Sequence, residues 1–94
     1  MYCGFNELTS LAVSQNTALE KLECEYNQLM LRLDVSQNTA LTNLDCNNNQ
    51  LTSLDISQNT ALVVLDCHNN LLTSLDVVQN TSLTRLYCQY NQLT

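Results

Sequence analysis

The chain has 94 residues, of which 45% are hydrophobic and 13% charged, and its formal net charge is −6. Only Lys21, Arg32 and Arg85 are cationic, so the basic clusters that bind phosphate backbones or anionic lipids are absent and nucleic acid is a poor candidate partner. Pro is absent, Gly occurs once, and no apolar run reaches membrane-spanning length, which indicates a folded chain without membrane insertion.

The sequence consists of copies of one repeat of 21 or 22 residues. A partial copy covers 1–18, full copies cover 19–40, 41–61 and 62–82, and a partial copy covers 83–94. Each full copy has two halves of the form L-x-x-L-x-h-x-x-N, where h is Cys in the first half and Val or Ile in the second. Stacked copies cover one another, so we expect a single repeat domain over residues 1–94, with no capping segment visible.

Both halves of the repeat have the pattern of a short strand. Apolar residues stand at the fourth and sixth positions of each half with a polar residue between them, which is a period of two. A helix needs about ten residues to form an apolar stripe, and neither half is long enough to hold one. We therefore predict two short parallel strands in every coil, turned at the Asn-containing segments, and little or no helix.

The five cysteines recur with the repeat, as Cys3, Cys24, Cys46, Cys67 and Cys88. No C-x-x-C pair of the zinc or redox kind is present, and the odd number argues against a fully paired disulfide framework. Each Cys stands where its coil needs a buried apolar residue, and a free thiol behaves as a small hydrophobe. The pattern predicts a buried column of reduced thiols and no metal.

Two columns of asparagines mark the turns of the coils, and they are Asn6, Asn27, Asn49, Asn70 and Asn91, and then Asn16, Asn38, Asn59 and Asn80. Asn tolerates left-handed backbone geometry, and its amide can bond to turn backbone or stack into a ladder. One coil has an extra residue between Leu29 and Leu33. We expect a bulge that keeps both leucines inward; the alternative is a small contact site made by Met30 and Leu31.

Neither catalysis nor a dedicated ion site is favoured. No Ser/His/Asp or Cys/His constellation, H-E-x-x-H motif or Gly-rich phosphate loop occurs, so we expect no enzyme activity and no cofactor. Two acidic columns invite a calcium hypothesis, and they are Glu23, Asp45 and Asp66, and then Asp34, Asp55 and Asp76. One carboxylate per coil does not provide the six to eight converging oxygens that calcium needs. His68 is interpreted as a lone polar surface residue.

The two halves of the repeat differ in how much they vary within this chain. The second half stays close to LTSLDISQNTA, whereas outward positions of the Cys half change from coil to coil and include every aromatic residue. Aromatic side chains give large contact area at low entropy cost, which favours a ligand surface, although strands also accommodate aromatics for packing alone. The candidate contact residues are Lys21, Glu23, Tyr26, Asp45, Asp66, His68, Arg85, Tyr87 and Tyr90.

The motif LxxLxCxxNxL resembles the bacterial leucine-rich repeats, most closely the 21-residue cysteine-ladder subtype (internalin J-like, common in Bacteroidetes surface proteins). Its marks are LDCNNNQLTSLDISQNTALVVLDCHNN and a Cys in every coil. The resemblance implies a curved, right-handed, β-rich leucine-rich-repeat solenoid, here of about 4.5 coils.

The same resemblance implies a secreted or cell-surface protein, often in adhesion, although no signal peptide precedes the first repeat. Its partner would be a protein or a carbohydrate. The alternative is a structural spacer, or a segment that associates end to end with other copies.

Overall fold

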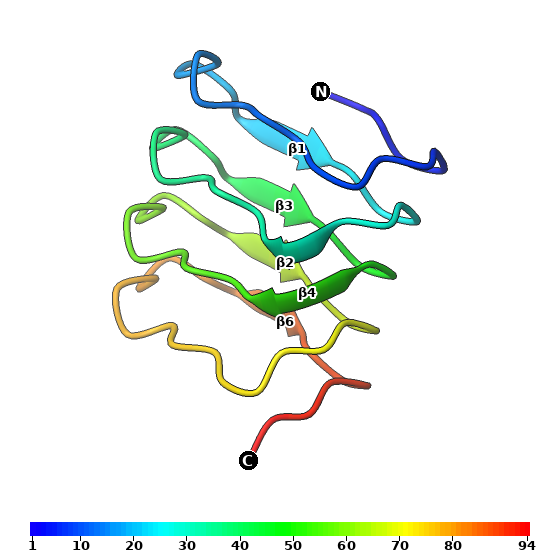
Figure 1. The fold of residues 1–94 in the computed structure, drawn as a ribbon. Coiled ribbons are helices and arrows are strands. Elements are labelled where there is room, and N and C mark those ends of the chain that lie inside the picture. The colour runs from blue at the N-terminus through cyan, green and yellow to red at the C-terminus, as the bar shows by residue number, and fades with distance from the viewer.

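The computed structural model describes all residues from Met1 to Thr94. It contains six short strands, which are β1 (Lys21–Glu23), β2 (Met30–Arg32), β3 (Asn43–Asp45), β4 (Gln50–Ser53), β5 (Val64–Asp66) and β6 (Arg85–Tyr87). The chain winds into a stack of coils with the two termini at opposite ends (Figure 1). No helix is present that could cross a membrane.

The Cys halves of successive coils form one parallel sheet in the order β1-β3-β5-β6. The register places Leu22, Leu44, Leu65 and Leu86 opposite one another. An isolated parallel bridge between Tyr2 and Glu23 continues this sheet into the first coil. The expected β-solenoid is therefore confirmed, with about three turns, slightly fewer than the 4.5 coils expected.

The second halves are less regular than the repeat predicts. Only β2 and β4 pair, in a two-stranded sheet, so the prediction of a second strand in every coil is wrong. These strands also lie before the Leu-x-Val or Leu-x-Ile segment that was expected to carry them. The reason is that the Asn38 and Asn59 side chains connect these parts of the coils: the Nδ2 of Asn59 donates to the carbonyls of Val35 and Asn38 at 3.0 and 2.9 Å.

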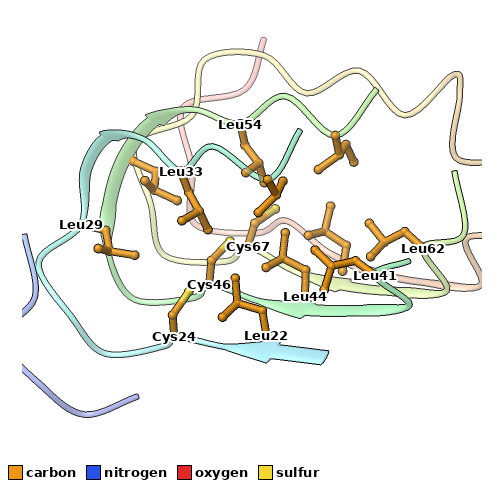
Figure 2. Close-up of a cluster of buried hydrophobic side chains, with 14 of the residues drawn as sticks. Leu22, Cys24, Leu29, Leu33, Leu41, Leu44, Cys46, Leu54, Leu62 and Cys67 are labelled. Carbon is orange, nitrogen blue, oxygen red and sulfur yellow. The ribbon is translucent and has the colours of Figure 1, made fainter. Parts of the chain in front are cut away.

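The core is the space between the two halves, and it is filled by the predicted columns. Figure 2 shows labelled leucines and cysteines from both halves pointing into this interior. Sixteen buried residues form one cluster, and the middle coils contribute the most completely buried ones, such as Leu44 and Ile56. The columns open at the ends of the stack, where Met1, Leu86 and Leu93 are 46%, 39% and 39% exposed.

All five cysteines are free, and they line this interior as predicted. Cys24, Cys46 and Cys67 are buried, and Cys3 and Cys88 in the end coils are half-buried. Burial raises the pKa of Cys24 and of Cys67 to about 12, and it raises the pKa of Cys46 well above its usual value. The buried thiols are therefore neutral packing groups near neutral pH.

The extra residue of the second coil forms the predicted bulge. The register of β2 against β4 shifts between Leu31 and Arg32. Leu29 and Leu33 both stay buried, whereas Leu31 is extruded with a φ of 64° and is 70% exposed. The bulge thus keeps the inward columns in phase at the cost of one strained, exposed leucine.

The asparagines bond to backbone as predicted, but they are not the residues with left-handed geometry. Asn49 accepts a hydrogen bond from the backbone N–H of Leu29 and donates to the carbonyls of Cys24 and Cys46. Positive φ values occur one residue earlier in each coil, at Phe5, Tyr26, Asn48, Asn69 and Tyr90, with angles from 53 to 59°. The prediction placed the left-handed turn on the wrong residue of the pair.

Candidate binding face

We call the outward side of β1, β3, β5 and β6, together with the turns that follow each cysteine, the Cys-strand face. The parallel register aligns Glu23 with Asp45, Asp45 with Asp66, and Asp66 with Tyr87. A second column beside it aligns Lys21, Asn43, Val64 and Arg85. The sheet therefore aligns six of the nine predicted contact residues, and the segments that follow the cysteines supply the other three, Tyr26, His68 and Tyr90.

Polar side chains on either side of Cys46 and of Cys67 contact one another, because alternate residues of an extended chain share a face. The Nδ2 of Asn47 donates to Asp45 at 2.5 Å and to Asp66 of the next coil at 3.3 Å. The Nδ1 of His68 lies 2.5 Å from an Asp66 carboxylate oxygen. His68 is thus half-buried and paired with Asp66, so its interpretation as a lone surface residue is wrong.

The carboxyl group of Asp45 is the most perturbed acid of this face. Burial is the largest cause, followed among the unfavourable effects by the charges of Asp66, Glu25 and Glu23, and together they raise the pKa of Asp45 to about 6. The hydrogen bond from the backbone N–H of Asn47 opposes this shift but does not cancel it. The face therefore concentrates negative charge that the chain itself does not neutralise.

Three of the left-handed turns carry exposed aromatic rings. Phe5 and Tyr26 stack with their centroids 4.7 Å apart and their planes 10° apart, and they are 64% and 49% exposed. Tyr90 occupies the same position of the last coil and is 74% exposed. Asn48 and Asn69 stand between them in this column, so Tyr26 and Tyr90 belong to two separate patches of the face.

Two features of this face were not anticipated. The first is the stacking of Phe5 on Tyr26, for which the only sequence signal is their equal position in the repeat. The second is Glu25, which is only 9% exposed. Its carboxylate packs over Gly4, and a Cβ at residue 4 would lie 2.7 Å from Glu25 Oε1. The signal for this contact was the single glycine of the chain, placed one repeat before Glu25.

The arrangement offers contact surface and charge, with no group suited to covalent chemistry. The thiols of Cys24, Cys46 and Cys67 are buried and have raised pKa values, and no three side chains of His, Cys, Asp or Glu come together as a metal site. A shallow cavity of about 160 Å³ lies between the acidic column and Tyr87, with Leu22, Leu44 and Val64 in its lining.

A larger groove, of about 440 Å³, lies on the other half of the coils and was not predicted. Polar side chains line most of it, including Ser53, Asp55, Ser57 and Asp76. The acids there are satisfied locally, since Asp55 accepts the backbone N–H of Ser57 at 2.9 Å. Hydrogen bonds from Ser57 hold the pKa of Asp55 below its usual value.

Known proteins share this architecture. A family model described as leucine rich repeats (2 copies) matches residues 39–80. Among solved structures, the functional domain of InlJ from Listeria monocytogenes, which includes a cysteine ladder, matches with a TM-score of 0.95 and 44% sequence identity. That match covers 98% of this chain and 20% of the other, so the chain spans about a fifth of that protein's length. No curated protein sequence matches the chain.

Proposed function

We propose that this chain, an internalin-like leucine-rich-repeat protein with a cysteine ladder, is a non-catalytic module that binds another protein through its Cys-strand face. The observation that carries the proposal is the segregation of variable, exposed contact residues onto one sheet. Tyr87, Arg85 and Tyr90 are all exposed on the last coil, and Tyr and Arg are the residue types that dominate interface hot spots.

The strained aromatics support the same conclusion. A left-handed backbone favours Asn or Gly, and the chain uses Asn at that position in two of its five coils. Placing Phe5, Tyr26 and Tyr90 there costs folding free energy, and their rings remain exposed. Phe5 and Tyr26 recover part of this free energy by stacking on each other, whereas Tyr90 is in no such pair. Strain at an exposed residue without a stabilising contact is typical of residues retained for contact with a ligand.

Selection of ligands followed by mapping tests this function. The wild-type chain is panned against a random peptide library and screened on a glycan array. Replacement of Tyr87 or Tyr90 by Ala should weaken each selected peptide by about 1–3 kcal/mol, which is roughly 5- to 150-fold, because a large buried contact is lost. Ser57→Ala, on the constant half, is the control and should change affinity little.

Two outcomes would contradict the proposal. The first is a loss of peptide affinity in Ser57→Ala as large as in the tyrosine variants. Binding would then lie on the second half of the repeat. Ligands found only on the glycan array would favour carbohydrate as the partner. Far-UV circular dichroism and thermal unfolding of each variant separate lost binding from lost structure.

The alternative function, a spacer that associates end to end, is favoured by the open ends of the stack. Apolar side chains such as Met1 and Leu93 are exposed there, and the end strand β6 pairs on one edge only. Such edges attract further strands. Light scattering at increasing concentration distinguishes the two: growth of linear oligomers without any ligand supports the spacer, and a monomer opposes it.

A further inference from the structure

The acidic column of the Cys-strand face has no basic side chain of its own chain to neutralise it. Glu23, Asp45 and Asp66 lie in register on neighbouring strands, which are spaced about 4.8 Å apart in such sheets. The chain's only ion pair between a Lys or Arg and a carboxylate joins Arg32 to Asp34, at 4.0 Å, outside this face. Within the chain, Asp45 and Asp66 are contacted by the backbone N–H groups and the side chains of Asn47 and His68, and by no Lys or Arg.

The second acidic column is exposed to solvent, which makes it an internal reference for the Cys-strand face. Asp34 accepts hydrogen bonds from the backbone N–H and the hydroxyl of Ser36 at 3.0 and 2.6 Å. Asp55 and Asp76 each accept a backbone N–H two residues on. Hydrogen bonds hold the pKa of Asp34 below its usual value, whereas the pKa of Asp45 is raised. Asp45 and Asp66 also accept a backbone N–H two residues on, at 3.2 and 3.3 Å, so this hydrogen bond does not distinguish the columns. The columns differ in burial, since Asp34, Asp55 and Asp76 are exposed whereas Asp45 and Asp66 are half-buried. A half-buried carboxylate has less water around it and gains more from an external cation.

Glu25 adds a fourth carboxylate to the Cys-strand face, and one of its oxygens has no hydrogen-bond partner within the chain. The residue is nine-tenths buried, and its Oε2 atom has no hydrogen-bond partner. Its charge also acts on Asp45, where it opposes ionisation. A buried anionic oxygen without a donor is costly, so positive charge brought close to this face would be strongly favourable.

The cavity beside the column has the shape and lining that a basic side chain needs. Val64 is half-buried and provides hydrocarbon surface, and Asp45 and Asp66 lie at the same opening together with Tyr87. Lys and Arg have an apolar stem that packs on hydrocarbon and a cationic head. The head is attracted both by carboxylates and by the face of an aromatic ring.

We propose that the partner of the Cys-strand face is a basic protein segment whose Lys or Arg side chains lie along Glu23, Asp45 and Asp66. This inference rests on the proposed binding function and adds the chemistry of the partner. The net charge of −6 on the chain steers such a segment toward it, and the flanking aromatic rings supply apolar contact.

Fluorescence anisotropy with a fluorescein-labelled peptide of eight lysines tests the proposal. The triple variant Glu23→Gln/Asp45→Asn/Asp66→Asn removes three charges from the Cys-strand face and should weaken binding by about 10-fold or more. The matched control removes three charges from the other column, by Asp34→Asn, Asp55→Asn and Asp76→Asn, and should weaken binding by less than about 3-fold. Thermal unfolding confirms that both variants are folded.

An equal loss of octalysine affinity in the two triple variants would show attraction by net charge alone and would overturn the proposal. A wild-type chain that binds no octalysine at low salt would overturn it as well. The peptides selected from the random library give a second readout, because they should be enriched in Lys and Arg. Selected peptides that depend on Tyr87 but carry no such enrichment would overturn the basic partner and leave the binding function standing.

Discussion

Asp45 and Asp55 stand ten residues apart in one coil, and they illustrate how differently its two halves are built. Asp45 lies half-buried in a four-stranded sheet among other acids, and its pKa is raised to about 6. Asp55 lies exposed in a turn that supplies its own hydrogen bonds, and its pKa is lowered. The second half thus keeps its carboxylates exposed in turns, whereas the Cys half places half-buried carboxylates side by side on neighbouring strands.

The two asparagine columns differ in the opposite sense, because the one in the Cys half is the more fully hydrogen-bonded, and they give the largest expected effect. The side chain of Asn49 forms four hydrogen bonds, including one that its Oδ1 accepts from the N–H of Leu29. Asn59 donates two, and its Oδ1 is buried without a partner. Asn49→Ala should therefore cost about 3–5 kcal/mol of unfolding free energy, and Asn59→Ala about 1–3 kcal/mol.

Urea unfolding followed by circular dichroism measures both changes. An equal loss of unfolding free energy in Asn59→Ala and Asn49→Ala would contradict this prediction, because the two asparagine columns would then stabilise their coils equally. Equal slopes of free energy against urea concentration are needed for this comparison, since a changed slope would indicate a less compact native or denatured state.

The inward columns could be predicted because a period-2 pattern repeated every 21 or 22 residues has one stacking register. The same reasoning located the thiol column and the bulge at Leu31, where only an extruded residue keeps Leu29 and Leu33 inward. The Cys-strand face followed from variation between coils, which is visible where no ladder demands identical residues.

What the sequence did not predict depends on geometry between neighbours. Asn occurs at or beside the left-handed residue in every coil, so residue type could not say which of the pair adopts it. The pairing of Asp66 with His68 and the packing of Glu25 over Gly4 depend on side-chain direction after the strand ends. A second strand was overpredicted because side-chain amides replace backbone pairing in that half.

The pH dependence of stability gives an intermediate effect and separates the two aspartates. Between the ordinary pKa of 3.8 and the folded value of about 6 for Asp45, the folded chain binds more protons than the unfolded chain. Stability from this group therefore rises as pH falls from about 7 to about 4, by on the order of 1 kcal/mol after allowance for solvent screening. Asp45→Asn should remove that rise.

Asp55 has the opposite sign, because its pKa is lowered on folding. Its contribution is fully present above the ordinary value of 3.8 and is lost as pH falls through the folded pKa. Asp55→Asn should therefore leave the slope between about pH 4 and pH 7 unchanged. Urea unfolding at several pH values checks both variants, and a wild-type chain that weakens steadily from pH 7 to pH 5 would contradict the assignment to Asp45.

The smallest expected effect concerns the left-handed residues, and it is a gain. Tyr90 has a φ of 59° and is 74% exposed, whereas Asn48 and Asn69 hold the same position with φ of 55 and 53°. Tyr90→Asn should raise the free energy of unfolding by about 0.5–1 kcal/mol, because Asn tolerates this geometry better. If Tyr90 serves binding, the same change should weaken the selected peptides, so stability and affinity would move in opposite directions.

Leu31 provides the matched control in the other half, since its φ is 64° and it is 70% exposed. Leu31→Asn should give a similar small stabilisation and leave affinity unchanged, because it relieves strain that belongs to the bulge alone. Thermal unfolding and peptide binding on the two variants form one experiment. A Tyr90→Asn chain that is stabilised but binds as tightly as the wild type would show that its strained tyrosine, like Leu31, is a consequence of coil geometry and not of recognition.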